Sequence, residues 1–198
     1  MKKYQIIYAD PPWDVKFGLD NHRERRKSTG SPKGTWSAPM MNYQTMSIDE
    51  IKLLPIKQLS ADNAVLFLWV INKFVEESYS VARAWGFKPI TLLTWAKSPR
   101  GLGLGGAFVQ TTEHLLFCRK GHLQPLKRCN TTWWNWKRPE KITGPKHSRK
   151  PDDVYDIIQS TFGDLSRIEL FARQKVDGWD CWGNEVDSDI ELKAGGEL

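Results

Sequence analysis

The stretch Gln5-Ile6-Ile7-Tyr8-Ala9-Asp10-Pro11-Pro12-Trp13 decides how the rest of the chain is read. Residues 5–9 are apolar and rich in β-branched and aromatic side chains, which predicts a short buried strand. Two prolines cannot continue a strand, because each lacks a backbone N–H and fixes φ. The strand therefore ends at Asp10 and leaves a carboxylate at its carboxyl edge, where open α/β sheets bind their ligands.

The residues that follow this strand suit one kind of chemistry. A carboxylate and the proline carbonyls can accept hydrogen bonds from an amine on a flat ring, while Trp13 stacks on that ring. The pattern predicts transfer of a group to such a weakly nucleophilic amine. The alternative is a capped turn with Trp13 in the core, and the strand and aromatic context favour the functional interpretation.

Length and composition predict one domain over residues 1–198, with enough chain for a sizeable core. No stretch approaches the roughly 20 apolar residues of a membrane span. The lysine-rich start runs directly into a strand, so we expect no signal peptide and a cytoplasmic protein without a membrane partner. The cysteines lack metal-binding spacing, so we expect neither a metal nor a disulfide; they are Cys118, Cys129 and Cys181.

The net charge of +6 is unevenly distributed. Basic residues gather within residues 22–27 and again between residues 119 and 150, in predicted loops, which indicates a polyanion such as nucleic acid. The second region also contains Trp133, Trp134 and Trp136. These rings could stack on bases or wedge into a duplex, or they could pack under the domain, and both interpretations carry about equal weight.

Strand and helix patterns alternate along the chain. A capping box at Ser47 and Glu50 starts a helix that ends near Leu54, and Asn72 is expected to cap a helix that ends at Gly86. A glycine-rich loop at 101–106 lacks the features of a phosphate-binding loop. The remaining predicted elements are strands Ala64–Val70, Ile90–Ala96, Glu113–Cys118 (antiparallel to the preceding strand) and Arg167–Ala172, and a helix over Pro151–Thr161. The expected architecture is α/β with a mostly parallel sheet.

Three stretches near the carboxyl end offer groups that an amino-acid-bearing nucleoside needs. Residues 147–151 supply a cation, residues 169–173 a strand-end carboxylate, and residues 178–185 amide or acidic acceptors. A cation can pair with a carboxylate, and acceptors can bind ribose hydroxyls. Each stretch alone also fits a plainer interpretation. In the order given, these are a surface lysine, a buried ion pair and a turn.

The sequence resembles the adenine N6-methyltransferase family typified by the catalytic subunit of the eukaryotic mRNA adenosine methyltransferase, often called MT-A-seventy. The similar stretches span nearly the whole chain in the family's order: residues 9–13, 43–47, 66–70, 85–87, 95–97, Glu113-His114, 150–152, 168–173 and Gly183-Asn184. The compact length resembles the bacterial and phage members, which are thought of mostly as DNA modifiers. The family has Gln where Glu185 stands, and His and Asn where Lys175 and Val176 stand.

The resemblance implies a Rossmann-like fold that binds S-adenosylmethionine, with the permuted, β-class-like motif order in which the catalytic motif comes first. It implies that Asp10 and the Pro11 carbonyl accept hydrogen bonds from the adenine amine, while Trp13 with Pro12 stacks on the extruded base. Lys150 would pair with the methionine carboxylate. The resemblance also places Tyr43 and Glu113 near the target adenosine, and it implies cofactor contacts from Asp10, Glu169, Phe171, Arg173, Asn184 and Glu185. We further expect substrate contacts from Lys97 and, because they lie in the basic aromatic segment, from Trp133, Trp134 and Trp136.

The resemblance leads to a site-specific DNA adenine-N6 methyltransferase that acts on a flipped adenine, with double-stranded DNA as the expected partner. Two alternatives stay open: the same reaction on RNA, and a non-catalytic nucleic-acid-binding partner subunit. Residues 14–46 and 97–147 are expected to supply substrate-binding loops. A homodimer fits a duplex substrate, and direct methyl transfer needs no metal.

Overall fold

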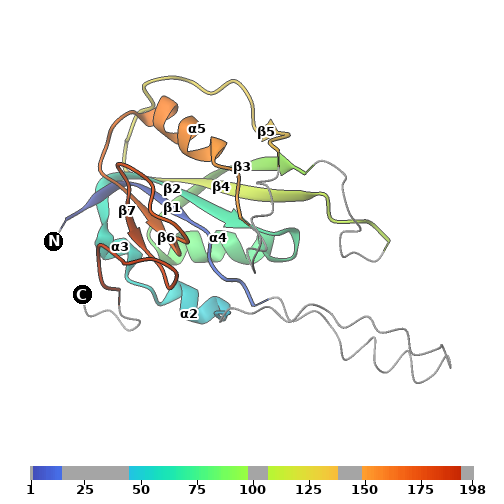
Figure 1. Ribbon diagram of the computed structural model, residues 1–198, viewed down its shortest axis with the longest axis horizontal. Helices are drawn as coiled ribbons and strands as arrows, with labels where there is room; N and C mark the ends of the chain where they lie inside the picture. Colours follow the sequence, from blue (N-terminus) through green and yellow to red (C-terminus); the bar gives the residue numbers. More distant parts are fainter. Residues whose placement is uncertain (1, 15–44, 98–106, 138–148, 193–198) are drawn as a thin grey trace.

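The computed structural model describes residues 2–14, 45–97, 107–137 and 149–192. Its centre is a seven-stranded sheet with the order β5-β3-β4-β2-β1-β6-β7 (Figure 1). The strands are β1 (Tyr4–Ala9), β2 (Ser60–Val70), β3 (Lys88–Ala96), β4 (Thr112–Lys120), β5 (Trp133–Trp134), β6 (Arg167–Leu170) and β7 (Asp180–Trp182). The strand predicted from residues 5–9 therefore lies in the interior of the sheet.

The sheet is mostly parallel, as the sequence predicted. β1 pairs in parallel with both β2 and β6, β6 pairs in parallel with β7, and β3 pairs in parallel with β5. Only β4 runs the other way, antiparallel to β2 and to β3. The antiparallel return predicted for residues 113–118 is thus confirmed, and it brings the start of β4 to the edge where β1 and β2 end.

The helices are α2 (Ile48–Lys52), α3 (Ile56–Leu59), α4 (Val75–Ala84) and α5 (Asp153–Phe162), with a 3₁₀ turn η1 over Asn72–Phe74. The predicted capping box is present: Ser47 accepts from the Glu50 amide, and Glu50 accepts from the Ser47 amide. Gly86, at φ 84°, follows α4, where the left-handed conformation favours glycine. None of the helices that the structure describes is long and apolar enough to cross a membrane.

The prediction that Asn72 caps a helix is wrong. The N-cap of α4 is Phe74, without a side-chain hydrogen bond. The Asn72 amide instead donates to the Thr112 carbonyl at 3.1 Å, and its oxygen lies 2.8 Å from Nε2 of His114. Asn72 lies two residues after the end of β2, so it meets the start of the antiparallel neighbour β4. This tertiary contact replaces the local cap.

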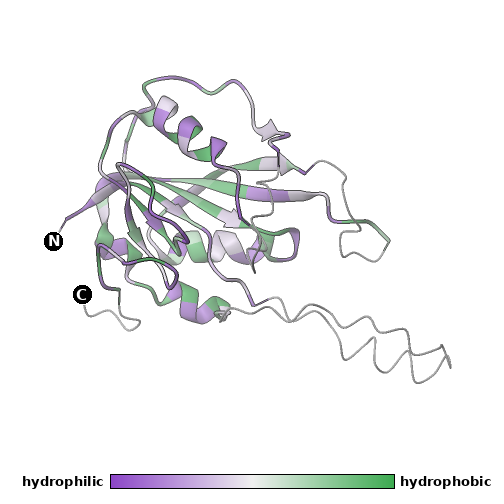
Figure 2. Ribbon diagram, viewed as in Figure 1, coloured by the Kyte–Doolittle hydropathy of each residue, from purple (hydrophilic) through white to green (hydrophobic). Residues whose placement is uncertain are grey.

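Helices cover both faces of the sheet, with α5 on one side and α2, α3 and α4 on the other (Figure 1), and the strands carry many hydrophobic residues (Figure 2). Side-chain alternation along the strands divides the core into two layers. Ile7, Leu66 and Leu68 face α2, α3 and α4 on one side of the sheet. Ile6 and Phe67 face α5 on the other side. Because successive strand residues point to opposite faces, the continuous apolar run in β2 supplies both layers.

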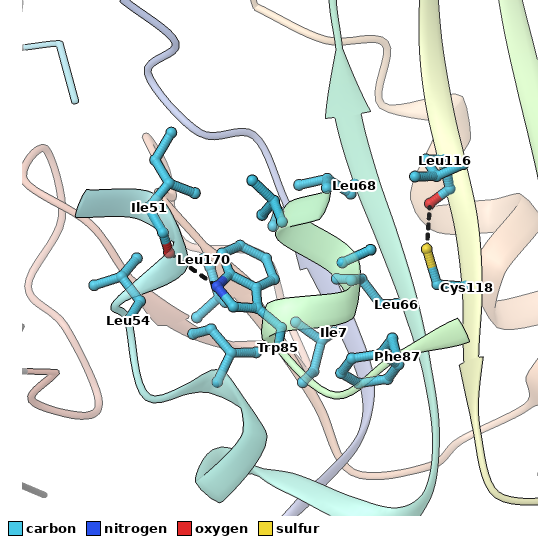
Figure 3. Close-up of a cluster of buried hydrophobic side chains, with 14 of the residues drawn as sticks. Ile7, Ile51, Leu54, Leu66, Leu68, Trp85, Phe87, Leu116, Cys118 and Leu170 are labelled. Carbon is cyan, nitrogen blue, oxygen red and sulfur yellow. Dashed lines mark hydrogen bonds between the residues drawn. The ribbon is translucent and has the colours of Figure 1, made fainter. Parts of the chain in front are cut away.

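Trp85 joins the helical layer to the sheet (Figure 3). Its side chain is fully buried beside α2, and its indole N–H donates to the Ile51 carbonyl at 2.9 Å. Ile7, Leu54 and Leu170 lie in the same cluster. Trp85 therefore combines a large buried apolar area with a satisfied polar atom, as buried tryptophans usually do.

Replacing Trp85 with Phe tests this anchor. The variant loses the buried indole donor and leaves part of its volume empty, so we expect the free energy of unfolding to fall by about 2 kcal/mol in urea denaturation. The matched control is Trp133→Phe, the same exchange at a side chain that is 60% exposed. An equal loss in both variants would contradict the anchoring role of Trp85.

Candidate active site

The predicted strand-end residues meet on one face and one edge of the sheet. Asp10 follows β1 in phase with Ile6, whose side chain lies in the α5 layer. Glu113 is in phase with Leu115 on β4, and Lys97 is in phase with Trp95 on β3, both in the same layer. The pleat therefore carries charged side chains from three strands to the face covered by α5.

Buried ion pairs connect these side chains into a network in which positive and negative groups alternate. The ammonium of Lys150, just before α5, lies 2.8 Å from Oδ2 of Asp10 and 3.4 Å from Oε2 of Glu113. The ammonium of Lys97 pairs with Oε1 of Glu113. The exposed fractions are 11% for the Lys150 side chain and 10% for that of Glu113. Two cations thus balance two anions where water is largely excluded.

The pKa values of the two carboxyl groups of this network shift in opposite directions. Burial alone would raise the pKa of Glu113, but Lys150 and Lys97 outweigh it and hold that pKa below its ordinary value. Burial raises the pKa of Asp10, and Lys150 offsets this only in part. Burial would lower the pKa of Lys150, but Asp10 and Glu113 raise it. Glu113 is therefore the firmly ionised carboxylate, and Asp10 is the one that takes a proton more readily.

Indole rings lie beneath both lysines. The Lys150 ammonium is 5.4 Å from the ring centroid of Trp69, and that of Lys97 is 5.1 Å from the centroid of Trp95. The two indoles meet edge to face at 6.1 Å. Cation–π attraction of this kind partly compensates the ammonium groups for lost hydration.

The two prolines form a tight turn whose carbonyl groups are in use. The Pro11 carbonyl accepts the Trp13 amide at 2.8 Å, and the Pro12 carbonyl accepts the Met46 amide at 2.9 Å. A carbonyl oxygen has two lone pairs, so the Pro11 oxygen can still accept a second donor.

Trp13 occupies the core position that the sequence left as an alternative. The turn sends its side chain to the face opposite Asp10, where it is 5% exposed and stacks on Phe74 at 5.6 Å. Its indole N–H donates to the Trp69 carbonyl at 3.0 Å. In this arrangement Trp13 fixes the turn that carries Asp10. Its indole N–H is hydrogen-bonded, and its ring is packed against Phe74.

A cavity borders Asp10 and extends toward the end of β6. Phe171, the residue after β6, has φ 63°, a left-handed conformation that is rare for an aromatic residue and turns the chain at this edge. Arg173 lies 3.5 Å from the Glu185 carboxylate in the same wall. The predicted residues that line the cavity are Asp10, Lys150, Glu169, Phe171, Arg173 and Glu185.

Some predicted residues lie elsewhere. Tyr43 lies outside the described residues, and Asn184 is exposed and does not line the cavity. The structure also adds lining residues that the sequence analysis missed: Tyr8, Arg149, Asp152, Tyr155 and Gln174. Tyr8 and Tyr155 could have been found, because Tyr8 is in phase with Asp10 on β1 and Tyr155 lies in the first turn of the helix that follows Lys150.

The three predicted tryptophan contacts differ in their surroundings. Trp136 packs against the α5 layer. The ring of Trp134 stacks on the ring of Trp136, with the two centroids 4.8 Å apart and the ring planes at 10°. Trp133 is 60% exposed at the edge strand β5. One short segment thus contains both a tryptophan that packs under the domain and a tryptophan that is exposed. Within the described ranges, no group of three or more His, Cys, Asp or Glu side chains could hold a metal ion.

This sheet, with its strand-end acidic site and adjoining cavity, defines an α/β enzyme of the Rossmann-like class, and comparison with known proteins places it more closely. Residues 4–185 match the MT-A70 family model, so the chain belongs to the MT-A70 family of methyltransferases, which use S-adenosylmethionine. The family resemblance and the α/β, mostly parallel fold class predicted from the sequence are both confirmed.

The relatives include bacterial and eukaryotic proteins. The whole chain is 33% identical over 202 residues to the type II methyltransferase M.MunI of a Mycoplasma species, of which it covers 84%. It is 28% identical over 196 residues to an N(6)-adenosine-methyltransferase MT-A70-like protein of Drosophila melanogaster. It is 26% identical over 196 residues to the human N(6)-adenosine-methyltransferase catalytic subunit METTL3. With 93% of its own length it spans only 27% and 28% of these two longer proteins.

Replacing Lys150 with Met tests the buried charge network. Because two carboxylates would lose their shared cation, we expect the free energy of unfolding to fall by about 3 kcal/mol at pH 8. In this variant the folded-state pKa of Asp10 lies above its unfolded value, so the destabilisation is present above that pKa and is relieved as the pH falls toward 5. Denaturation at both pH values measures this.

The control for Lys150 is Lys175→Met, because Lys175 forms ion pairs with Asp187 and Asp189 at the surface. We expect little change in stability there at either pH. A Lys150→Met variant whose stability did not depend on pH would contradict the shared buried network.

Proposed function

We propose that this protein is an adenine-N6 methyltransferase that modifies DNA, with Asp10 accepting a hydrogen bond from the amine of a flipped adenine. The single observation that carries the proposal is the position of Asp10, which belongs both to the buried charge network and to the wall of the cavity. The Asp10 carboxylate can therefore contact both the amine that accepts the methyl group and a cofactor bound in the cavity.

The chain's own groups suffice for positioning the amine. Lys150 occupies Oδ2 of Asp10, which leaves acceptor capacity on the other carboxylate oxygen, and the Pro11 carbonyl keeps one lone pair. Two acceptors that bind the amine hydrogens orient the nitrogen lone pair toward an electrophile. Asp10 and Glu113 then stabilise positive charge that develops on nitrogen, without complete proton transfer.

The side chains that line the cavity suit S-adenosylmethionine, which supplies an electrophilic methyl group when bound. Lys150 is a cation for the methionine carboxylate. Glu169 is a buried acceptor for ribose hydroxyls, and the Phe171 ring, held edge to face on Trp182 at 5.3 Å, is an apolar surface for the base. Arg173 and Glu185 complete the set of cofactor residues in this proposal.

DNA is the favoured substrate because the relative that matches the whole chain is named as a type II methyltransferase, whereas the adenosine methyltransferases are much longer proteins. Exposed basic side chains close in sequence to Trp133 suit a polyanion: they are Lys127, Arg128 and Lys137. Double-stranded DNA and a homodimer are part of the proposal. RNA is the second candidate, since the eukaryotic relatives are named for adenosine.

Transfer of label from S-adenosylmethionine to matched duplex DNA, single-stranded DNA and RNA, read by nucleoside mass spectrometry, tests the proposal. We expect N6-methyladenine in duplex DNA. Asp10→Asn should lower the rate about 10²- to 10³-fold, because it replaces a charged acceptor with an amide of the same shape. Circular dichroism should show that the variant is folded.

Each other outcome has a definite meaning. Label in RNA alone would replace the DNA proposal with the RNA one. An Asp10→Asn variant as active as the wild type would overturn the assignment of Asp10. No label in any substrate, with S-adenosylmethionine binding retained, would favour the non-catalytic partner subunit.

Replacing Trp133 with Ala tests the proposed nucleic-acid surface. Loss of an exposed ring that stacks on a base should weaken binding to single-stranded DNA by about 1–3 kcal/mol, measured by fluorescence anisotropy. Because no charge is removed, the dependence of affinity on salt should stay the same. The matched control is Leu53→Ala, since Leu53, which follows α2, is 61% exposed. Equal affinity of both variants for DNA would exclude Trp133 from the surface.

A further inference from the structure

Glu169 is a buried carboxylate held by a tyrosine. It is 8% exposed at the end of β6, and its Oε2 accepts the hydroxyl of Tyr155 from α5 at 2.8 Å. Among the described residues it forms no salt bridge, and Tyr155 is its one side-chain hydrogen-bond partner. An anion buried in this way depends on its hydrogen bonds to remain charged.

Tyr155 is itself fixed by aromatic contacts. Its ring lies edge to face on Tyr8 at 5.3 Å and on Trp179 at 5.4 Å. The direction of its hydroxyl is thus set by packing between α5 and the sheet. Both Tyr155 and Glu169 line the cavity, so the hydrogen bond lies within the wall that a ligand would contact.

The charged groups around Glu169 do not neutralise it. Asp10 at the end of β1 and Asp152 before α5 both act on it as like charges. Three cations line the same cavity, but each is engaged with another carboxylate: Lys150 with Asp10, Arg149 with Asp152, and Arg173 with Glu185. Burial first, and then the like charges, raise the pKa of Glu169 to about 7, against the opposing effect of Tyr155.

We propose that Tyr155 is a positioning residue that favours the ionised form of Glu169 and aims it into the cavity, so that Glu169, where it is still protonated, gives up its proton when the ribose hydroxyls of the cofactor bind. This rests on the proposed function, since it takes the cavity as the cofactor site. The balance is simple. Protonated Glu169 releases one proton to solvent when the ligand's hydroxyl groups donate to its carboxylate, and no other bond is made or broken.

The sign of the resulting pH dependence follows from linkage. The ligand binds the ionised carboxylate, so affinity is constant well above the pKa of free Glu169 and falls roughly tenfold for each pH unit below it. The hydroxyl of Tyr155 stabilises the ionised form. Removing that hydroxyl therefore moves the inflection to higher pH, whereas a purely structural defect lowers affinity equally at every pH.

Calorimetric titration of the protein with S-adenosylhomocysteine between pH 6 and 8.5 tests the proposal. Repeating it in two buffers of different ionisation enthalpy counts the protons released. For the wild type we expect release that approaches one proton as the pH falls below 7. For Tyr155→Phe, which keeps the ring contacts, we expect affinity at pH 7.5 to fall about tenfold and the inflection to move to higher pH.

The matched control is Tyr79→Phe, which deletes a hydroxyl from α4 on the opposite side of the sheet. It should follow the wild-type profile, and the ligand's own titration cancels because all three proteins bind the same ligand. A Tyr155→Phe profile parallel to that of the wild type would overturn the proposal, as would wild-type binding without proton release. A wild type that binds no S-adenosylhomocysteine at any pH would instead overturn the cofactor site.

Discussion

The structure depends on the ion pair between Lys150 and Asp10, which joins residues 140 positions apart. A carboxylate at the end of β1 and an ammonium before α5 are both largely buried, so neither can be left unpaired without a penalty of several kcal/mol. The pair therefore fixes the start of α5 against the carboxyl end of β1. Glu113 and Lys97 extend the same balance to β4 and β3, so the buried charge stays neutral across the edge.

Strand alternation separates the chemistry from the scaffold. Ionisable groups at the carboxyl edge lie on the α5 face, and the opposite face holds the packed layer of α2, α3 and α4. Trp13 belongs to that opposite layer and clamps the turn that presents Asp10. A residue only three positions from the proposed catalytic group thus packs on the other side of the sheet, across the turn that Pro11 and Pro12 form.

Local signals predicted what local forces decide. The end of β1, the capping box at Ser47 and the turn at Gly86 each depend on a few neighbouring residues, and all three were found from sequence. The side on which Trp13 lies, and the contact that takes Asn72 away from capping, depend on how the strands pair. The ion pair of Lys150 with Asp10 also needed the assembled sheet, since the sequence predicted only that each group faces a ligand.

The same buried network explains how a weak nucleophile could be methylated at this edge. Lys150 and Lys97 keep Glu113 ionised, which leaves Asp10 as the carboxylate that responds to its surroundings. Positive charge that forms on an amine beside Asp10 would enter a site whose anions are already in place, so little reorganisation accompanies it. A network without the lysines would bind a proton instead, and an Asp10 paired more completely would have no acceptor left for the amine. In the proposed reaction, Asp10 can bind the amine because its hydrogen bond with Lys150 engages one carboxylate oxygen and leaves the other as an acceptor.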